Sequence, residues 1–575
     1  YLQGNGYIVS WCVGHLVELA QADAYHEKYA KWKREDLPII PSAWRYQVKK
    51  DKEKQLAVLR KLMNDNDVDT IVCATDAGRE GELIFRLVYK TCSCTKPIQR
   101  LWISSMEDEA IRQGMANLKD GAAYHSLYQS ALCRAQADWL VGINATRLFS
   151  ILYGQTLNVG RVMTPTLALI VQREQDVQAF QPEPFYTPLI DCGGFTSTGE
   201  RQPETESAME IRAACDGKAA TVQNVEKQQK ITAPPKLYDL TTLQRDANRL
   251  YGFTAQQTLD YLQSLYEKKL TTYPRTDSQY LTADMANTAN QIALAMTGIL
   301  PYMEGVSFSP DIGRVLDSSK VSDHHAIIPT MESVKKGVED LPATEKAVWM
   351  LVANRLLCAT ADKHEYETVT VSLDCAGFSF TTKGKTILHD GWKGIERAFL
   401  ATLKEKPKTE PDETALPELQ GGQVFEAVAA SVKDGKTSPP KRYTEDTLLS
   451  SMETAGAADM PDDAERKGLG TPATRASTIE KLVSTGLIER KKKNLMPTEK
   501  GINLITVLPD VIKSPALTAE WETMLKQVER GEMSADVFMG GIRGLLESLM
   551  ATAQASNAYR YLFPSDDKRE AIGVC

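Results

Sequence analysis

Residues 69–88 read D-T-I-V-C-A-T-D-A-G-R-E-G-E-L-I-F-R-L-V. The stretch begins with a short apolar run, passes through an acidic loop that contains two glycines, and ends in apolar residues that open a helix. A continuous apolar run that leads through such a loop into a helix is typical of a parallel α/β sheet, whose strands are covered on both faces. The sequence therefore predicts an α/β domain around this unit.

Three carboxylates, Asp76, Glu80 and Glu82, follow the predicted strand where it ends. Mg²⁺ prefers oxygen ligands and usually keeps several waters, so this edge of the sheet can hold the ion. Glu80 can alternatively act as a general acid or base. A structural interpretation is equally open, since acidic residues favour the first turn of a helix, near the positive end of its dipole.

The hydrophobic period changes several times along the rest of the chain. Residues 119–180 and 254–266 carry apolar side chains at helical spacing, whereas the period-two run at 369–373 predicts a strand. Residues 402–416, rich in Lys, Glu and Pro, predict a solvated loop. The chain of 575 residues is long enough for about three to five domains.

A helix followed by a basic hairpin is predicted near the end of the chain. Residues 471–483 begin with a capping Thr471 and a proline in the first turn, and their apolar side chains share one face. Two short strands then flank Lys491-Lys492-Lys493-Asn494. This order is typical of a winged helix, although a solvated surface turn explains the lysines equally well.

The composition limits the possible partners and the compartment. A net charge of −8 disfavours bulk attraction to a polyanion, so any contact with nucleic acid must come from local basic patches. The apolar runs are too short to span a bilayer. Ten cysteines without a C-x-x-C pair favour reduced thiols in a cytoplasm over a disulfide framework or a complete zinc site. The sequence has no G-x-x-x-x-G-K-[ST] loop for a nucleotide.

Residues 271–278 read T-T-Y-P-R-T-D-S and have two interpretations. In the first, 270–273 form a short strand, Pro274 ends it, and Thr-Asp-Ser forms a turn or a helix cap. In the second, Tyr273 is a nucleophile and Arg275 is its electrostatic partner. The segment alone does not decide between them.

Two further segments contain residues that suit phosphate binding. Residues 323–330 read D-H-H-A-I-I-P-T, and one of the histidines can donate a hydrogen bond to a phosphate. Residues 158–167 read N-V-G-R-V-M-T-P-T-L, where Gly160 permits close backbone approach and Arg161 can bind a phosphate. A surface histidine pair and an ordinary glycine turn explain the same residues when each segment is taken alone.

Together and in this order, the segments resemble those of the type IA DNA topoisomerases, and the resemblance covers nearly the whole chain. Residues 75–82 are similar to the acidic motif of the family's Toprim domain, and 273–278 to its nucleophile motif. The other matching segments are W-C-V-G-H-L at 11–16, R-A-Q-A-D-W-L-V-G at 134–142, 158–167, 324–330 and G-L-G-T-P-A-T-R at 468–475.

The resemblance implies an enzyme that changes DNA topology without ATP. Tyr273 would attack a phosphodiester of single-stranded DNA, giving a 5′-phosphotyrosine and a free 3′-hydroxyl, and the reaction would reverse after another strand has passed. The implied catalytic residues are Tyr273, Arg275, His324 and Glu80, with Mg²⁺ on Asp76 and Glu80. Neither a nucleotide cofactor nor a membrane is implied, and the expected location is cytoplasmic. The implied DNA contacts are His15, Arg134, Asp138, Asn158, Val159, Gly160, Arg161, Val162, Met163, Gln263, Glu267 and Arg475.

The same resemblance implies a multidomain fold of α/β, α and β parts, arranged as a ring with winged-helix-like elements. We expect a Toprim domain, a helical domain that binds DNA, a β-rich arch, a tyrosine domain that carries Tyr273, and the start of a C-terminal region. Their expected bounds are 1–118 (Toprim domain), 119–180 and 437–555 (helical domain), 181–236 and 366–436 (arch), 237–365 (tyrosine domain) and 556–575 (C-terminal region).

Two departures from the family's pattern affect the expected activity. Gly78 stands where the Toprim motif often has a second Asp. The family's first strand, with a Glu and a Lys, is expected to precede Tyr1, and Cys575 resembles the first ligand of a zinc ribbon. We therefore expect a fragment with impaired turnover from an active parent, whose remaining C-terminal part binds partner proteins.

Two other functions remain open at this stage. A Toprim nuclease or primase explains the acidic motif but not Tyr273-Pro274-Arg275 or His324. A catalytically silent protein that binds single-stranded DNA is favoured by the expected absence of the N-terminal Glu. Among these, a topoisomerase alone leaves a covalent protein–DNA adduct, so trapping on a labelled oligonucleotide distinguishes the three.

Overall fold

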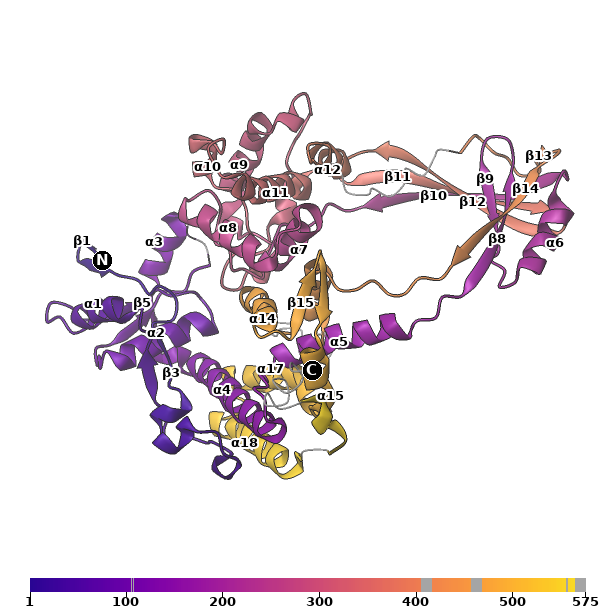
Figure 1. Cartoon of the computed structure of the whole chain (residues 1–575). Coiled ribbons are helices and arrows are strands. Elements are labelled where there is room, and N and C mark those ends of the chain that lie inside the picture. Colours follow the sequence, from indigo (N-terminus) through magenta and orange to yellow (C-terminus); the bar gives the residue numbers. More distant parts are fainter. Residues whose placement is uncertain (105, 107, 405–415, 457–467, 555–556, 564–575) are drawn as a thin grey trace.

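The computed structural model describes residues 1–104, 106, 108–404, 416–456, 468–554 and 557–563. Its parts follow one another around a ring (Figure 1). The long strands of the arch leave the tyrosine domain, and two connecting segments join the arch to the helical domain. The ring is closed by two helices of the helical domain, α13 (Glu445–Thr454) and α14 (Pro472–Ser484), which pack against α7 (Leu240–Tyr251) and α8 (Ala255–Glu267) of the tyrosine domain.

The Toprim domain contains the predicted parallel unit. Strands β5 and β6 pair in parallel, Ile71 with Ile98, and β7 completes the sheet in the order β5-β6-β7. The helix after the loop begins at Arg79, four residues earlier than the apolar pattern suggested, so Glu80 and Glu82 lie in its first turn. The elements are β1 (Leu2–Gly4), β2 (Tyr7–Val9), β3 (Val17–Leu19), β4 (Tyr46–Val48), α1 (Glu53–Met63), β5 (Ile71–Cys73), α2 (Arg79–Thr91), β6 (Ile98–Arg100), α3 (Asp108–Ala116) and β7 (Lys119–Asp120), with three short 3-10 helices, Ala22–Ala24, Glu27–Ala30 and Arg34–Asp36.

The helical domain is assembled from two distant stretches of the chain. A long helix, α4, packs against α2 of the Toprim domain and against α17 and α18 near the end of the chain. Leu148 and Leu167 share one apolar core with Leu448, Ile479 and Leu504. The remaining helices are α4 (His125–Tyr153), α5 (Met163–Ala179), α15 (Glu499–Val507), α16 (Asp510–Lys513), α17 (Ala516–Glu529) and α18 (Ala535–Thr552), with 3-10 helices at Gly121–Tyr124 and Asn557–Leu562.

The predicted helix and hairpin near the end of the chain are present in this domain. In α14 the Thr471 backbone N–H donates to Thr474 Oγ1 at 2.9 Å, which satisfies one of the free donors at the start of the helix. Strands β15 (Ile488–Lys491) and β16 (Asn494–Pro497) pair antiparallel, Ile488 with Pro497. The helix followed by a basic hairpin is therefore confirmed.

The arch is a single seven-stranded sheet in the order β13-β10-β11-β12-β9-β8-β14. The predicted period-two strand at 369–373 lies in the middle of β11 and pairs with both β10 and β12. Buried Val371, Leu373 and Phe380 form the core of the sheet. The elements are β8 (Pro184–Asp191), β9 (Thr196–Gly199), α6 (Thr205–Cys215), β10 (Ala220–Thr232), β11 (His364–Cys375), β12 (Phe378–His389), β13 (Val424–Phe425) and β14 (Ala429–Lys436).

The tyrosine domain is mainly helical around a core that includes Leu262, Trp349 and Leu356. One segment differs from the expected bounds. Residues 392–401 were assigned to the arch, but they form α12, whose Trp392 and Phe399 belong to this core, so α12 is counted with the tyrosine domain below. The other helices are α7, α8, α9 (Ala286–Ile299), α10 (Met331–Lys336) and α11 (Ala343–Thr360), with 3-10 helices at Ala283–Met285, Pro301–Met303, Ile312–Val315 and Ser318–Lys320.

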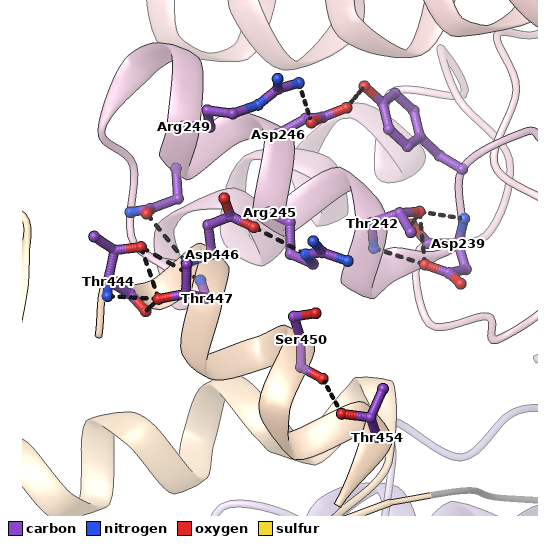
Figure 2. A network of polar contacts seen from close by, with 12 residues as sticks. Asp239, Thr242, Arg245, Asp246, Arg249, Thr444, Asp446, Thr447, Ser450 and Thr454 are labelled. Carbon is purple, nitrogen blue, oxygen red and sulfur yellow. Dashed lines mark hydrogen bonds and ion pairs between the residues drawn. The ribbon is translucent and has the colours of Figure 1, made fainter. Parts of the chain in front are cut away.

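The contact between the tyrosine and helical domains includes a polar network, shown in Figure 2. Arg245 of α7 donates to Asp446 of α13 at 2.9 Å, and the backbone N–H of Asp446 donates to Asn248 Oδ1 at 3.2 Å. Thr444 caps α13 by accepting a hydrogen bond from the backbone N–H of Thr447. Figure 2 also shows Asp239 capping α7 through Thr242. The network in Figure 2 therefore adds one partly exposed ion pair and one backbone hydrogen bond across the domains, beside two helix caps.

Some predictions fall outside the part that the structure describes. Most of the expected loop at 402–416 and the expected zinc ligand Cys575 lie there. Among the described residues, no helix is both long enough and apolar enough to cross a membrane.

Candidate active site

The segment that carries Tyr273 is fixed against the segment that carries His324. In place of the strand expected over 270–273, Thr271 forms an isolated bridge to Pro329. Thr276 Oγ1 then donates to the His324 carbonyl at 2.8 Å. Because residues 271–278 and 324–330 share these contacts, Tyr273 and His324 are held on the same side of the tyrosine domain.

The side chain of Tyr273 meets a histidine that reaches the Toprim domain. Its ring centroid lies 4.1 Å from that of His324 and 5.4 Å from that of Tyr266. His324 Nε2 is 3.3 Å from Asp76 Oδ1, at the end of β5. The neighbouring histidine points elsewhere, since His325 Nδ1 lies 2.8 Å from the Ala326 carbonyl. The structure therefore brings Tyr273, His324 and Asp76 to one place, as predicted.

The electrostatics around Tyr273 oppose loss of its proton. Burial raises the pKa of the phenol and the Asp76 carboxylate raises it further, whereas Arg275 lowers it, and the net shift is upward. Burial also raises the pKa of Asp76. The hydrogen bond to His324 and the positive charges of His324, Arg100 and Arg275 lower it by more, so the pKa of Asp76 lies below its usual value. Asp76 is therefore an anion at neutral pH and, together with burial, disfavours the phenolate form of Tyr273.

Buried Arg100 holds the acidic loop in place. Its guanidinium donates to the carbonyls of Thr75, at 2.8 Å, and Asp76, at 2.5 Å, and lies 3.1 Å from Glu82. Glu82 is almost completely buried and also pairs with Arg86. Gly81 lets the loop fold back tightly, because a Cβ there would lie 2.2 Å from the Asp76 carbonyl oxygen. Glu82 is thus a structural residue, and the carboxylates that face outward are Asp76 and Glu80.

Glu80 contacts the segment near the start of the chain that the resemblance also singled out. Its Oε1 lies 2.6 Å from His15 Nε2, and both side chains are partly exposed, at 44% and 31%. The predicted sites at 11–16 and 75–82 are therefore adjacent. Either partner can exchange a proton with a group placed above the loop.

The carboxylate oxygens of the loop suit Mg²⁺, although the protein donors alone do not form a complete coordination shell. Within the described ranges, no three His, Cys, Asp or Glu side chains are grouped as ligands of one metal ion. Mg²⁺ is commonly held by one or two carboxylates together with waters and substrate phosphates, so Asp76 and a second carboxylate are a sufficient donor set. The donor chemistry of the loop therefore fits the ion.

The three arginines that were expected to contact phosphates have acidic partners, and Arg161 and Arg475 are buried. Arg161 is 2% exposed and donates to Asp138 at 2.7 Å, and Arg134 lies 3.7 Å from buried Glu522. Arg475, 3% exposed, donates to Thr241 Oγ1 at 2.8 Å across the contact with the tyrosine domain. Any phosphate would compete with these partners, so the contacts of these arginines with DNA stay predictions.

The segment around Arg161 is held by backbone contacts. The Val159 N–H donates to Thr146 Oγ1 on α4, and the Gly160 N–H donates to Thr164 Oγ1. Val159 is buried, whereas Asn158, Val162 and Met163 are not. The segment thus forms a fixed turn between α4 and α5.

Residues beside Tyr273 on α8 are accessible. Exposed Arg275 donates to Gln263 Oε1 at 2.9 Å, and Gln263 Nε2 donates to Glu267 at 2.9 Å. Both α8 residues had been predicted to contact DNA. The cluster places a fixed guanidinium next to the phenol, where it can face a phosphate.

Sequence reasoning missed four residues of this region: Arg100, Glu522, Arg79, which donates to Glu522 at 3.0 Å, and Asp323, which contacts Gly78. Arg100 and Arg79 show no recognisable signal, and Asp323 was quoted with the histidines but given no role. Glu522 left one signal, because it lies between Trp521 and Leu525 on the apolar face of a helix, where a carboxylate requires a partner.

Comparison with known proteins is consistent with this geometry. A family model described as "DNA topoisomerase" matches residues 122–540, and one described as "Toprim domain" matches residues 1–106. The full-length topoisomerase I from Thermotoga maritima has a similar fold, with a TM-score of 0.72 over 95% of this chain and 87% of that chain, at 23% identity.

The chain belongs to the type IA DNA topoisomerases. Within that family it is similar to bacterial DNA topoisomerase 3. The protein of that name from Bacillus licheniformis is 40% identical over 97% of this chain and 78% of its own length. The protein from Bacillus subtilis is 40% identical over 98% of this chain and 79% of its own length.

Proposed function

We propose that the protein cleaves one strand of DNA through Tyr273, passes another strand through the break and reseals it, without ATP. Family membership supports the class of reaction. The observation that carries the assignment of residues is the packing of the Tyr273 ring against His324, which in turn reaches Asp76 of the Toprim domain.

The reaction is a transesterification at phosphorus. The Tyr273 phenol gives its proton to solvent as its oxygen forms a bond to the 5′-phosphate, the bond from phosphorus to the 3′-oxygen breaks, and the leaving oxygen takes up a proton. Arg275 stabilises the negative charge that develops on the phosphoryl oxygens, and His324 donates a hydrogen bond to the phosphate. The phosphotyrosine conserves the energy of the ester, so reversal needs no nucleotide.

Glu80 and His15 are suited to proton transfer at the 3′-oxygen. Their side chains form a close pair at the rim of the loop, partly open to solvent. Such a pair can protonate the leaving oxygen during cleavage and take the proton back during resealing.

Asp76 and Glu80 of the acidic loop would hold Mg²⁺, which supplies positive charge beside the scissile phosphate when bound. Its positive charge would counter burial and the Asp76 carboxylate, which together raise the pKa of Tyr273.

The expected substrate is single-stranded DNA in the cytoplasm. Exposed Arg275 and Gln263 border the tyrosine, whereas the net charge of the chain is −8, so binding relies on local contacts. We expect affinity to fall as salt rises, and single strands to bind more tightly than duplex.

The test is relaxation of a negatively supercoiled plasmid with Mg²⁺ and without ATP. We expect the linking number to change for the wild-type chain and for Tyr266→Phe, a matched control that removes a neighbouring hydroxyl. Tyr273→Phe should bind DNA normally and leave the linking number unchanged. Equal activity of the Tyr273→Phe variant, or strand cuts that are never resealed, would contradict the proposal.

A further inference from the structure

The segment that follows β6 carries an exposed tryptophan. Trp102 is 39% exposed, although it directly follows buried Leu101. A single exposed apolar side chain is common on protein surfaces and is not by itself a binding site. Two other features distinguish Trp102: its position in the sheet, and the contacts that hold its ring.

The topology of the sheet brings Trp102 to the edge that carries Asp76. Strands β5 and β6 run parallel, and Cys73 at the end of β5 lies opposite Arg100 at the end of β6. Asp76 follows the first strand by three positions, and Trp102 follows the second by two. Ligands of open α/β sheets bind outside the carboxyl ends of the strands, and Trp102 lies at that edge.

Buried Arg100 connects the tryptophan to the acidic loop. Its guanidinium donates to the Asp76 carbonyl at 2.5 Å, and Cζ of the same group lies 5.0 Å from the centroid of the Trp102 ring. Arg100 is 1% exposed, so it has little freedom to move. Trp102 is thus held one guanidinium away from the loop that would bind Mg²⁺.

A second aromatic ring supports the tryptophan. Tyr124, the last residue of the 3-10 helix before α4, stacks on Trp102 with the ring centroids 5.0 Å apart and an angle of 20° between the planes. Arg100 Cζ also lies 5.9 Å from the Tyr124 ring. Stacking and cation–π contacts both favour a defined ring orientation. The indole would therefore lose little conformational freedom when a ligand stacks on its exposed part.

We propose that Trp102 is a stacking platform for a base of the DNA fragment that ends in the free 3′-hydroxyl. The inference rests on the proposed function and adds a nucleotide subsite to it. After cleavage, one fragment is bonded to Tyr273, whereas the other is held by noncovalent contacts alone. Trp102 lies on the Toprim domain, whose Glu80 and His15 would exchange a proton with the 3′-oxygen.

Stacking suits the needs of this chain. Its net charge is −8, and the three arginines that were expected to contact phosphates have acidic partners. Every base has a π face, so stacking on an aromatic side chain tolerates any sequence and requires no positive charge. Such a contact would keep the 3′-hydroxyl near the phosphotyrosine for resealing, whichever base precedes the break.

The test compares two replacements of Trp102 in the Tyr273→Phe background, in which a single-stranded oligonucleotide stays intact. Trp102→Leu keeps apolar bulk but removes the π face, so we expect its affinity to fall roughly 5- to 150-fold, the range for loss of one stacked base. Trp102→Phe keeps an aromatic face and should retain most of the affinity. Fluorescence anisotropy measures the dissociation constants.

Trp32→Leu in the same background is the matched control. Trp32 is 42% exposed and is also contacted by an arginine, because Arg147 Cζ lies 5.4 Å from its ring. Arg147 belongs to α4 rather than to the Toprim sheet, so this tryptophan has the same exposure without the link to the acidic loop. The Trp32→Leu chain should bind the oligonucleotide as tightly as its Tyr273→Phe parent.

Two further measurements separate stacking from a structural role. The slope of affinity against salt should be the same for Trp102→Leu and its parent, because stacking releases no counterions. An abasic nucleotide is then moved along the 5′ side of a cleavage position mapped with the wild-type chain. At one position it should remove the difference between Trp102→Leu and the parent. If the substitution instead disturbed Arg100, the difference would persist with every abasic oligonucleotide.

The proposal is overturned if Trp102→Leu binds as tightly as its parent, or if Trp102→Phe loses as much affinity as Trp102→Leu. It is also overturned if no abasic position on the 5′ side removes the difference. The covalent DNA adduct of the wild type reports separately on the proposed function, because binding in the Tyr273→Phe background does not require cleavage.

Discussion

Neighbouring residues of the Toprim loop, Gly78 and Arg79, take part in two very different junctions. Arg79 is 3% exposed and donates to Glu522 of α17, which is itself 4% exposed and lies within 3.9 Å of Arg134 and Arg161. Gly78 faces the tyrosine domain, where Asp323 contacts it beside a 46% exposed Asp76. One junction is a buried charge network, and the other is polar and half open to solvent.

The difference shows which part of the ring can move. Separating the first junction would expose several buried charges or leave them without partners, which costs free energy. The second consists of groups that water can solvate as soon as they part. We therefore expect the Toprim and helical domains to stay together while the tyrosine domain parts from the Toprim domain. The tyrosine domain would carry one DNA end on Tyr273 as the other end stays bound.

Removal of Glu522 should have the largest effect on stability. Glu522→Ala leaves buried arginines without their shared carboxylate, so we expect a loss of roughly 3–5 kcal/mol in the free energy of the first unfolding transition. Urea titration measures it. Glu520→Ala, on the exposed face of the same helix, is the control and should have little effect. A loss as large from Asp323→Asn would remove the contrast between the junctions.

Acid should weaken the buried junction next. Burial raises the pKa of Glu522, but Arg134, Arg79 and Arg161 overcome it and lower that pKa to about 2. Because the folded-state pKa lies below the unfolded one, this stabilisation is complete above the unfolded pKa and is lost as pH falls through the folded one. The loss amounts to about 3 kcal/mol. The gap in melting temperature between the wild type and Glu522→Gln should be constant from pH 6 to 5 and should close as pH falls from 4.5 to 2; a constant gap throughout would contradict the shift.

At the open junction, Arg275→Lys should affect chemistry rather than stability. A lysine cannot reproduce the planar fork that donates to Gln263 and a phosphate together, so we expect single-turnover cleavage to slow roughly 10- to 100-fold. Arg397→Lys, an exposed pair with Asp390 in the same domain, is the control. A cleavage rate equal to that of the wild type would show that Arg275 does not face the phosphate.

The smallest effect is expected at the contact shown in Figure 2. Asp446→Asn removes a partly exposed ion pair with Arg245 but keeps the backbone hydrogen bond to Asn248. We expect a loss of about 0.5–1 kcal/mol, measured by thermal unfolding. The loss should disappear in an Arg245→Ala background, where the pair is already broken. A larger loss would mean that this contact also holds the ring shut.

Local sequence predicted the features that depend on local interactions. The strand, loop and helix at 69–88, the helix over 472–484 and the hairpin after it follow from hydrophobic period, caps and turns within a few residues. The approach of Tyr273 to Asp76 and His324 was predicted from the order of the motifs. No local pattern places residues that lie 197 and 51 positions away, respectively, beside the tyrosine.

Contacts between distant segments could not be predicted from the sequence. Arg79 and Glu522 are 443 positions apart, and neither residue type indicates its partner. The apolar face of α12 predicts burial but not the core it joins. Asp323 was missed for the same reason, because its contact with Gly78 joins two distant segments.

The most direct test of the account is the chemical identity of the covalent adduct. The full chain is trapped with denaturant on a single-stranded oligonucleotide labelled at either end, digested with protease and analysed by mass spectrometry. We predict that the DNA is attached to Tyr273 through its 5′-phosphate, with the other fragment ending in a free 3′-hydroxyl. An adduct on another residue, or one joined through a 3′-phosphate, would contradict the assignment of Tyr273 as the nucleophile.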